Sequence, residues 1–200
     1  MTRSELRRNW RIYFTGEDGL DAGGLTREWF KLVTDEIFNP DLGMWVTSEG
    51  NQMCLDINPA SSVCCPEDHL IFFRVVGRVL GRALFDGQLV HGHMSAHLYK
   101  HLLGWPVSMS DLADVSLDYH NSLMETLGMG DDIEFLYATF SMFEEEFGIK
   151  REVELVPGGA NIPVTRQNVP EYVEACMKYK LFGRVEAQLN ELILGFLDVV

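Results

Sequence analysis

Basic residues are scarce in this sequence. Its 200 residues include 16 lysines and arginines against 30 aspartates and glutamates, which gives a formal net charge of −14. A protein that binds DNA or RNA without sequence preference needs a basic face to displace counterions from the phosphates. The charge balance therefore argues against nucleic-acid binding. It favours a basic protein partner, although an acidic surface also serves solubility alone.

Cysteines and long apolar runs are also few. The four cysteines are Cys54, Cys64, Cys65 and Cys176, and no two have the Cys-x-x-Cys spacing of a metal site. No apolar run approaches the roughly 20 residues that span a bilayer, and the first ten residues lack the pattern of a secretory signal. We therefore expect an intracellular protein without disulfides or a structural metal, located in the cytoplasm or also in the nucleus.

The motifs of common catalytic sites are missing. The chain has no Gly-x-Ser-x-Gly nucleophile turn and no phosphate-binding loop that ends in Gly-Lys-Ser/Thr. His93, His97 and His101 would share one helix face, but they lack the glutamate and the third ligand of a zinc motif, so we interpret them as surface or packing residues. No cofactor is expected.

Hydrophobic residues, by contrast, make up 46% of the chain and aromatic residues 11%. This is enough to build one or two domains with a buried core, and it argues against disorder. Three arginines follow one another at helical spacing, Arg74, Arg78 and Arg82. In an acidic chain we expect them to pair with internal carboxylates.

Hydrophobic periodicity and turn residues predict an α+β protein, mostly helical with small β pieces. Strands are expected at residues 10–14, 44–47, 53–57, 135–142, 151–156 and 162–164. Helices are expected at residues 26–38, 66–85, 94–103, 111–127 and 168–181, with another from about residue 183 to the chain end. Thr26 is the expected N-cap of the first helix, and Asn39-Pro40 should end it.

Seven motifs then resemble, in order, those of HECT-type ubiquitin ligases. The first runs from Phe14 to Phe30 and contains Gly-Glu-Asp-Gly-Leu-Asp-Ala-Gly-Gly. The others are Asn39-Pro-Asp-Leu-Gly43, Ile57-Asn-Pro59, Phe73-Arg-Val-Val-Gly-Arg-Val-Leu-Gly81, Leu117-Asp-Tyr-His-Asn-Ser-Leu123, Ile162-Pro-Val-Thr165, and Glu171-Tyr172 followed by Gly195-Phe196. Any one motif is weak evidence for the family, but the seven motifs occur in the family's order across residues 10–196.

The resemblance implies the N-terminal lobe of a HECT domain, a mostly helical α+β fold with small β-hairpins. Residues 10–113 and 183–200 would form its large subdomain, and residues 114–182 the small subdomain that binds a ubiquitin-conjugating enzyme. In this family a C-terminal lobe carries the cysteine that forms a thioester with ubiquitin. None of the four cysteines matches it, so we expect that residue beyond Val200 and an isolated chain without transferase activity.

The resemblance also implies which residues contact the conjugating enzyme. They fall on a first groove helix, the loop and strand after it, and a later helix: Tyr119, Ser122, Leu123, Met129, Leu136, Ala138, Tyr172 and Cys176. An apolar groove of this kind anchors an exposed side chain of a partner. The alternative is that each residue is simply core of the subdomain. Met129 and Cys176 stand where larger aromatic residues are common, which leaves affinity and partner choice open.

The function implied by the resemblance is two-step ubiquitin transfer. Ubiquitin passes from the conjugating enzyme to a cysteine of the C-terminal lobe and then to a substrate lysine, while regions outside this chain bind the protein substrate. The alternative is a non-catalytic adaptor or decoy that binds conjugating enzymes. Acidic residues of the small subdomain could steer a basic partner or could simply be solvated: Asp131, Asp132, Glu134, Glu144, Glu145 and Glu146.

Overall fold

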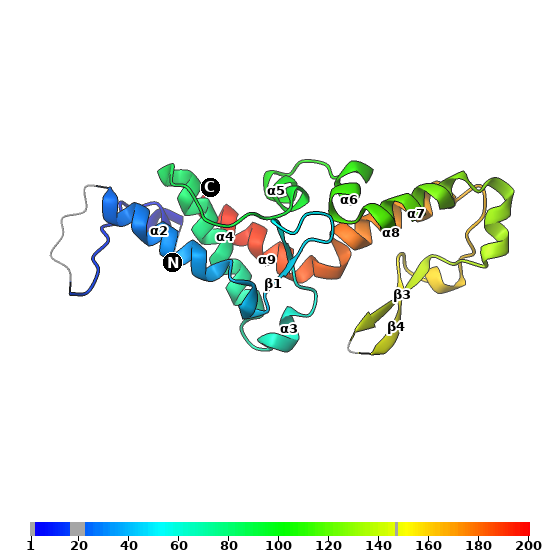
Figure 1. The fold of residues 1–200 in the computed structure, drawn as a ribbon, viewed down its shortest axis with the longest axis horizontal. Helices are drawn as coiled ribbons and strands as arrows, with labels where there is room; N and C mark the ends of the chain where they lie inside the picture. Colours follow the sequence, from blue (N-terminus) through cyan, green and yellow to red (C-terminus); the bar gives the residue numbers. More distant parts are fainter. Residues whose placement is uncertain (1–2, 17–22, 147) are drawn as a thin grey trace. The chain divides into compact units, whose positions relative to one another are not determined.

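The computed structural model describes residues 3–16, 23–146 and 148–200 (Figure 1). The chain divides into two compact units. Unit 1 comprises residues 1–48, 52–106 and 185–200, and unit 2 comprises residues 49–51 and 107–184. The long segment of unit 2 starts at residue 107, and Leu112 near its start belongs to the buried core of this unit.

Unit 1 is helical apart from one small hairpin. Its helices are α1 (Arg3–Leu6), α2 (Gly24–Ile37), α3 (Ser61–Cys64), α4 (His69–Asp86), α5 (Ala96–Leu103) and α9 (Glu186–Leu197), with a 3-10 turn η1 (Pro40–Leu42). Its strands β1 (Trp45–Thr47) and β2 (Leu55–Ile57) pair antiparallel, with Trp45 opposite Ile57. Helix α2 ends before Asn39-Pro40 and α5 before Gly104, as the sequence predicts.

Glycines bring α4 and α9 together along their lengths (Figure 1). A Cβ atom added to Gly77 would overlap the backbone carbonyl oxygen of Leu192, and one added to Gly195 would overlap that of Arg74. The two backbones are therefore in direct contact, which only residues without a side chain allow. This contact places Leu189, Leu192 and Phe196 of α9 in the core of unit 1.

The arginine stripe of α4 pairs with internal carboxylates, as predicted. Nη2 of Arg74 donates to the carboxylate of Asp198 at 2.9 Å, and Nε of Arg78 donates to the same carboxylate at 2.8 Å. Arg74 also pairs with Glu191 at 3.2 Å. The hydrogen bonds from Arg74 and then from Arg78 hold the pKa of Asp198 below its ordinary value of 3.8. These pairs tie the end of α9 to α4.

We expect Asp198→Asn to lower the free energy of unfolding by about 1 kcal/mol at neutral pH. The pKa of Asp198 is lower in the folded state than its unfolded value of 3.8, so the ionised carboxylate stabilises the fold at any pH above 3.8. This contribution is lost as the pH falls through the lower pKa of the folded state. Urea unfolding of both proteins at stepwise lower pH measures this. The difference should shrink on acidification; a difference independent of pH would contradict the ion-pair account.

Residues 10–14 do not form the predicted strand. They lie in irregular coil, and Trp10 packs edge-on against Trp29 at 5.3 Å and beneath the Arg82 guanidinium at 4.6 Å. Trp10 therefore holds the start of this segment through side-chain contacts instead of a hydrogen-bonded ladder. The prediction that Thr26 caps α2 is also wrong, since the cap is Gly23 in the left-handed conformation. The Glu17-Asp18-Gly19 turn lies outside the described residues.

Unit 2 holds two long helices, a hairpin and short 3-10 turns (Figure 1). Its elements are α6 (Met109–Val115), α7 (Leu117–Gly128), η2 (Gly130–Leu136), β3 (Ser141–Glu146), β4 (Ile149–Glu154), η3 (Gly159–Asn161) and α8 (Val169–Leu181), and a last turn η4 (Gly183–Val185) contains the boundary with unit 1. The described core of unit 2 is apolar and includes Leu112, Leu123, Ile133, Phe140, Val173 and Cys176.

Three predictions of secondary structure in unit 2 are wrong. The structure has two helices where a single one is predicted at 111–127. The backbone of Ser116 is extended, so this residue ends α6 and begins α7. The strand predicted at 135–142 begins only at Ser141, and η2 precedes it. Residues 162–164 contribute one isolated bridge, between Thr139 and Pro163. Among the described residues, no helix is long and apolar enough to cross a membrane.

Candidate functional site

Tyrosines from two helices surround a buried thiol in unit 2. Tyr119 of α7 and Tyr172 of α8 both donate hydrogen bonds to the sulfur of Cys176, which is buried on α8. The Tyr172 ring also packs edge-on against Phe140 at 5.5 Å. Burial raises the pKa of the Cys176 thiol despite the two hydrogen bonds, and burial likewise raises the pKa of both tyrosines. All three groups are therefore neutral at physiological pH.

The eight residues implied by the resemblance all lie in unit 2, at different depths. Leu123 and Cys176 belong to the buried core. The partly buried residues that pack against this core are Tyr119, Met129, Ala138 and Tyr172. Ser122 is exposed on α7, and Leu136 is 49% exposed at the end of η2.

These depths separate residues that can touch a partner from residues that support them. Ser122 and Leu136 are accessible, and the four partly buried residues offer a face to solvent above the core. Leu123 and Cys176 are covered by neighbouring side chains, so in this structure they can shape such a surface only from beneath. Contact between the eight residues and a partner stays a prediction.

The sequence did not single out two exposed aromatic residues beside these positions. Phe135 and Tyr137 flank Leu136 and are 75% and 88% exposed. Tyr137 ends η2 with a φ of 50°, and it is the one non-glycine residue with a positive φ among the described residues. Their signal in the sequence is the apolar run Phe135-Leu136-Tyr137, which lies inside the strand predicted at 135–142.

Thiol reactivity should distinguish the cysteines of the chain. Cys64 is exposed and Cys176 is buried with a raised pKa, and only a thiolate reacts rapidly with electrophiles. Under native conditions at neutral pH we expect a maleimide to modify Cys64 rapidly and Cys176 only after unfolding. Peptide mass spectrometry over a time course measures both sites in one sample. Native labelling of Cys176 at the rate of Cys64 would contradict its placement in the core.

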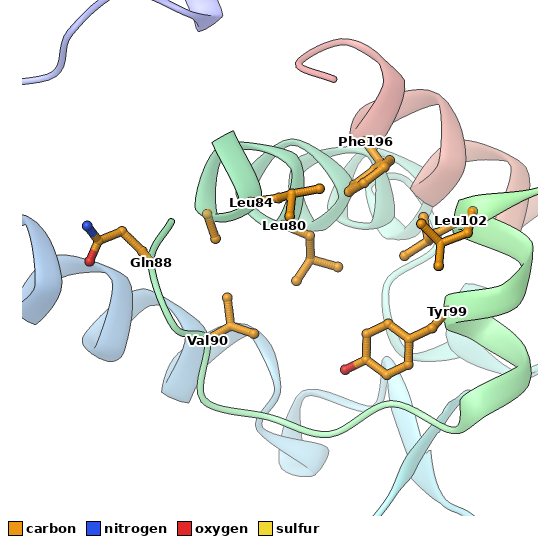
Figure 2. A pocket seen from close by; sticks show the side chains of 9 residues that line it. Leu80, Leu84, Gln88, Val90, Tyr99, Leu102 and Phe196 are labelled. Carbon is orange, nitrogen blue, oxygen red and sulfur yellow. The ribbon is translucent and has the colours of Figure 1, made fainter. Parts of the chain in front are cut away.

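Unit 1 has a separate apolar pocket of about 270 Å³ (Figure 2). Its lining comes from α4, the segment after it, α5 and α9: Leu80, Ala83, Leu84, Gln88, Val90, Tyr99, Leu102, Leu103 and Phe196. Figure 2 shows leucine and phenylalanine side chains around it, with the Tyr99 ring at one side. The lining carries no carboxylate, imidazole or thiol, and its polar side chains are those of Gln88 and Tyr99.

The described parts of the chain also hold no group of three or more histidine, cysteine, aspartate or glutamate residues arranged to hold a metal ion. Unit 2 is acidic, with 15 aspartates and glutamates against six lysines and arginines.

Comparison with known proteins identifies the family. Residues 31–200 match the model of the HECT domain, described as a ubiquitin-transferase. The chain is 40% identical over 189 residues to the E3 ubiquitin-protein ligase ptr1 of Schizosaccharomyces pombe, covering 94% of this chain and 6% of that protein. It is 41% identical over 198 residues to the probable E3 ubiquitin-protein ligase hulA of Aspergillus fumigatus, covering 98% of this chain and 24% of that protein.

A third relative, the E3 ubiquitin-protein ligase Nedd-4 of Drosophila melanogaster, is 37% identical over 202 residues, covering 100% of this chain and 20% of that protein. The chain thus spans about a quarter or less of the length of these relatives. The family match extends over most of the chain and includes both units. We conclude that the chain belongs to the HECT-domain family of ubiquitin transferases.

Proposed function

We propose that unit 2 binds a ubiquitin-conjugating enzyme, so that ubiquitin can pass to a cysteine of a catalytic lobe and from there to a substrate lysine. In this role the chain positions the conjugating enzyme and contributes no reacting group of its own. Holding the ubiquitin thioester close to the accepting cysteine turns a bimolecular encounter into an effectively intramolecular one, which can contribute several orders of magnitude in rate.

One observation carries the proposal. The residues that match the family's conjugating-enzyme contacts come from segments far apart in the sequence, yet all lie in one compact unit. Tyr119 and Tyr172 are directly linked through Cys176, and six of the eight residues retain some exposed surface. A partly apolar surface with a few tyrosines is typical of interfaces whose binding energy is concentrated in a small number of contacts.

The test is titration of the chain with a panel of purified conjugating enzymes by calorimetry. For any enzyme that binds, we expect Leu136→Asp and Tyr172→Ala to weaken affinity about tenfold or more, because both change the proposed surface. Leu123→Asp is unsuitable, since it would put a carboxylate into the core and unfold unit 2.

Ile149→Asp is the matched control. Ile149 is an exposed apolar residue of β4 in the same unit, outside the proposed surface, and its replacement makes the same chemical change as Leu136→Asp. Equal affinity of the wild type and the Leu136 variant, with the fold intact by circular dichroism, would overturn the proposal. We further propose that none of the four cysteines accepts ubiquitin, so a charged conjugating enzyme should leave no reducible ubiquitin adduct on the chain.

A further inference from the structure

We propose that Glu49 and Lys180 are positioning residues for binding of the conjugating enzyme, because together they hold the ring of Tyr119 in a fixed orientation. This inference rests on the proposed function, in which Tyr119 is one of the contacts. It adds two residues that the family motifs do not imply. Both act through Tyr119 and need not touch the partner.

The loop that carries Glu49 is held against the end of α6. Residues 49–51 belong to unit 2, and the amide of Gly50 donates to the carbonyl oxygen of Val115 at 2.8 Å. A Cβ atom added to Gly50 would overlap the carbonyl oxygen of Asp114, so the two backbones are in direct contact. The backbone of Glu49 therefore has a fixed place beside the junction of α6 and α7.

The carboxylate of Glu49 is charged and accepts from two donors. The side chain of Ser116 donates one hydrogen bond, and Nζ of Lys180 donates another at 3.3 Å. The hydrogen bond from Ser116 is the largest cause of a pKa below the ordinary value of 4.5; burial opposes it, and the positive charges of Lys180 and Arg184 lower the pKa further. Glu49 is therefore ionised at neutral pH and attracts the ammonium group of Lys180.

Lys180 extends from α8 to the ring of Tyr119 on α7, the helix beside it (Figure 1). Its side chain is only 18% exposed, and Nζ lies 5.7 Å from the centroid of the ring. An ammonium at this distance is attracted by the face of an aromatic ring. A lysine stem is flexible, so the carboxylate of Glu49 is what keeps the ammonium in this place.

Tyr119 is thereby held at two points. Its hydroxyl donates to the sulfur of Cys176, and the ammonium of Lys180 lies over its ring. The ring packs against the core of unit 2 but is only partly buried, so its orientation decides which part of it a partner can reach. A side chain that is ordered before binding loses less conformational entropy on binding. We therefore expect Glu49 and Lys180 to increase affinity without a contact of their own.

The experiment is calorimetry with a conjugating enzyme that binds the wild-type chain. We expect Glu49→Gln and Lys180→Met each to weaken affinity about threefold to fivefold. The double variant should bind no more weakly than Lys180→Met alone, because both changes release the same ring. Lys180→Arg should keep the wild-type affinity, since a guanidinium also pairs with a carboxylate and also lies on an aromatic face.

Glu174→Gln is the matched control. It breaks another ion pair of α8, that of Glu174 with Lys178 at 2.6 Å, on the side of the helix away from Tyr172, and it should leave affinity unchanged. In NMR spectra of the tyrosine-labelled chain, the ring signals of Tyr119 should change in Glu49→Gln and stay unchanged in Glu174→Gln.

Three outcomes would overturn this inference and leave the proposed function standing, provided that Tyr172→Ala still weakens binding. The first is a Glu49→Gln variant with wild-type affinity. The second is a double variant in which the two losses add in full, because Glu49 would then not act through Lys180. The third is a Tyr119 ring signal that does not respond to Glu49→Gln. If no conjugating enzyme binds the wild type, both proposals fail together.

Discussion

Replacing Gly77 with alanine should destabilise unit 1 by about 3 kcal/mol. The added methyl group would overlap the carbonyl oxygen of Leu192 and the amide nitrogen of Phe196. Both are backbone atoms of α9, so no side-chain rotation can relieve the clash, and the two helices must separate. Because a domain is typically stable by only 5–15 kcal/mol, a large share of the stability would be lost. Thermal and urea unfolding measure the change.

Gly24→Ala provides the matched control. Gly24 is also a helical glycine of unit 1, at the start of α2, and a Cβ atom there would meet no atom within 4 Å. This change should leave stability unaltered or raise it by up to about 1 kcal/mol, because alanine has the higher helix propensity. If the two substitutions have equal effects, the direct contact of the α4 and α9 backbones is wrong.

Arg82→Leu should also cost about 3 kcal/mol and should release the N-terminal segment. Arg82 is only 2% exposed and donates to the carboxylate of Asp86 at 2.6 Å and to the backbone carbonyls of Leu6 and Arg8 at 2.6 and 2.8 Å. Leucine would leave all three acceptors without their donor and would remove the cation that lies over the Trp10 ring. Lysine cannot replace it, since it lacks the planar fork of donors.

Two measurements check this prediction. Urea unfolding gives the loss of stability, and limited proteolysis should show faster cleavage within residues 3–10 of the variant. Arg166→Leu is the control, because Arg166 pairs with Asp131 at the surface, where an ion pair contributes at most about 1 kcal/mol. A loss no larger for Arg82 than for Arg166, or unchanged proteolysis, would contradict the role assigned to Arg82.

Elements set by local chemistry were predictable from the sequence. Asn39-Pro40 ends α2 because proline cannot continue a helix, and Gly104 ends α5 in the left-handed conformation that glycine favours. The arginines of α4 pair with carboxylates, because an acidic chain contains many of them. Elements that depend on distant contacts were not predictable. Residues 10–14 have the composition of a strand, but no segment of the described residues pairs with them.

The break between α6 and α7 has the same kind of cause. The amide of Gly50 donates to the carbonyl oxygen of Val115 at 2.8 Å, and Glu49 accepts a hydrogen bond from Ser116. Both residues come from a loop more than 60 positions earlier in the chain. Helical periodicity continues across residue 116, so the sequence pattern alone gives no sign that this loop interrupts the helix.

For the candidate site, the motifs select eight residues that lie in one unit, but they do not give the depth of each side chain. The resemblance implies that both Ser122 and Leu123 contact the partner, but in the structure Ser122 is exposed and Leu123 is buried. Neighbouring residues of a helix point in different directions, so they lie at different depths. Cys176 is likewise a core residue whose thiol faces two tyrosines. The exposure of Phe135 and Tyr137 was not predictable, because a strand and an exposed 3-10 turn can share an apolar and aromatic composition.

The most direct test of the account is to map the conjugating-enzyme surface by methyl NMR of the labelled chain. On addition of an enzyme that binds, signals of Met129 and Leu136 should shift, while those of Leu84 and Leu194, exposed in unit 1, should not. That result would place the partner on unit 2. Shifts confined to unit 1, or no shift with any enzyme of the panel, would contradict the proposed function.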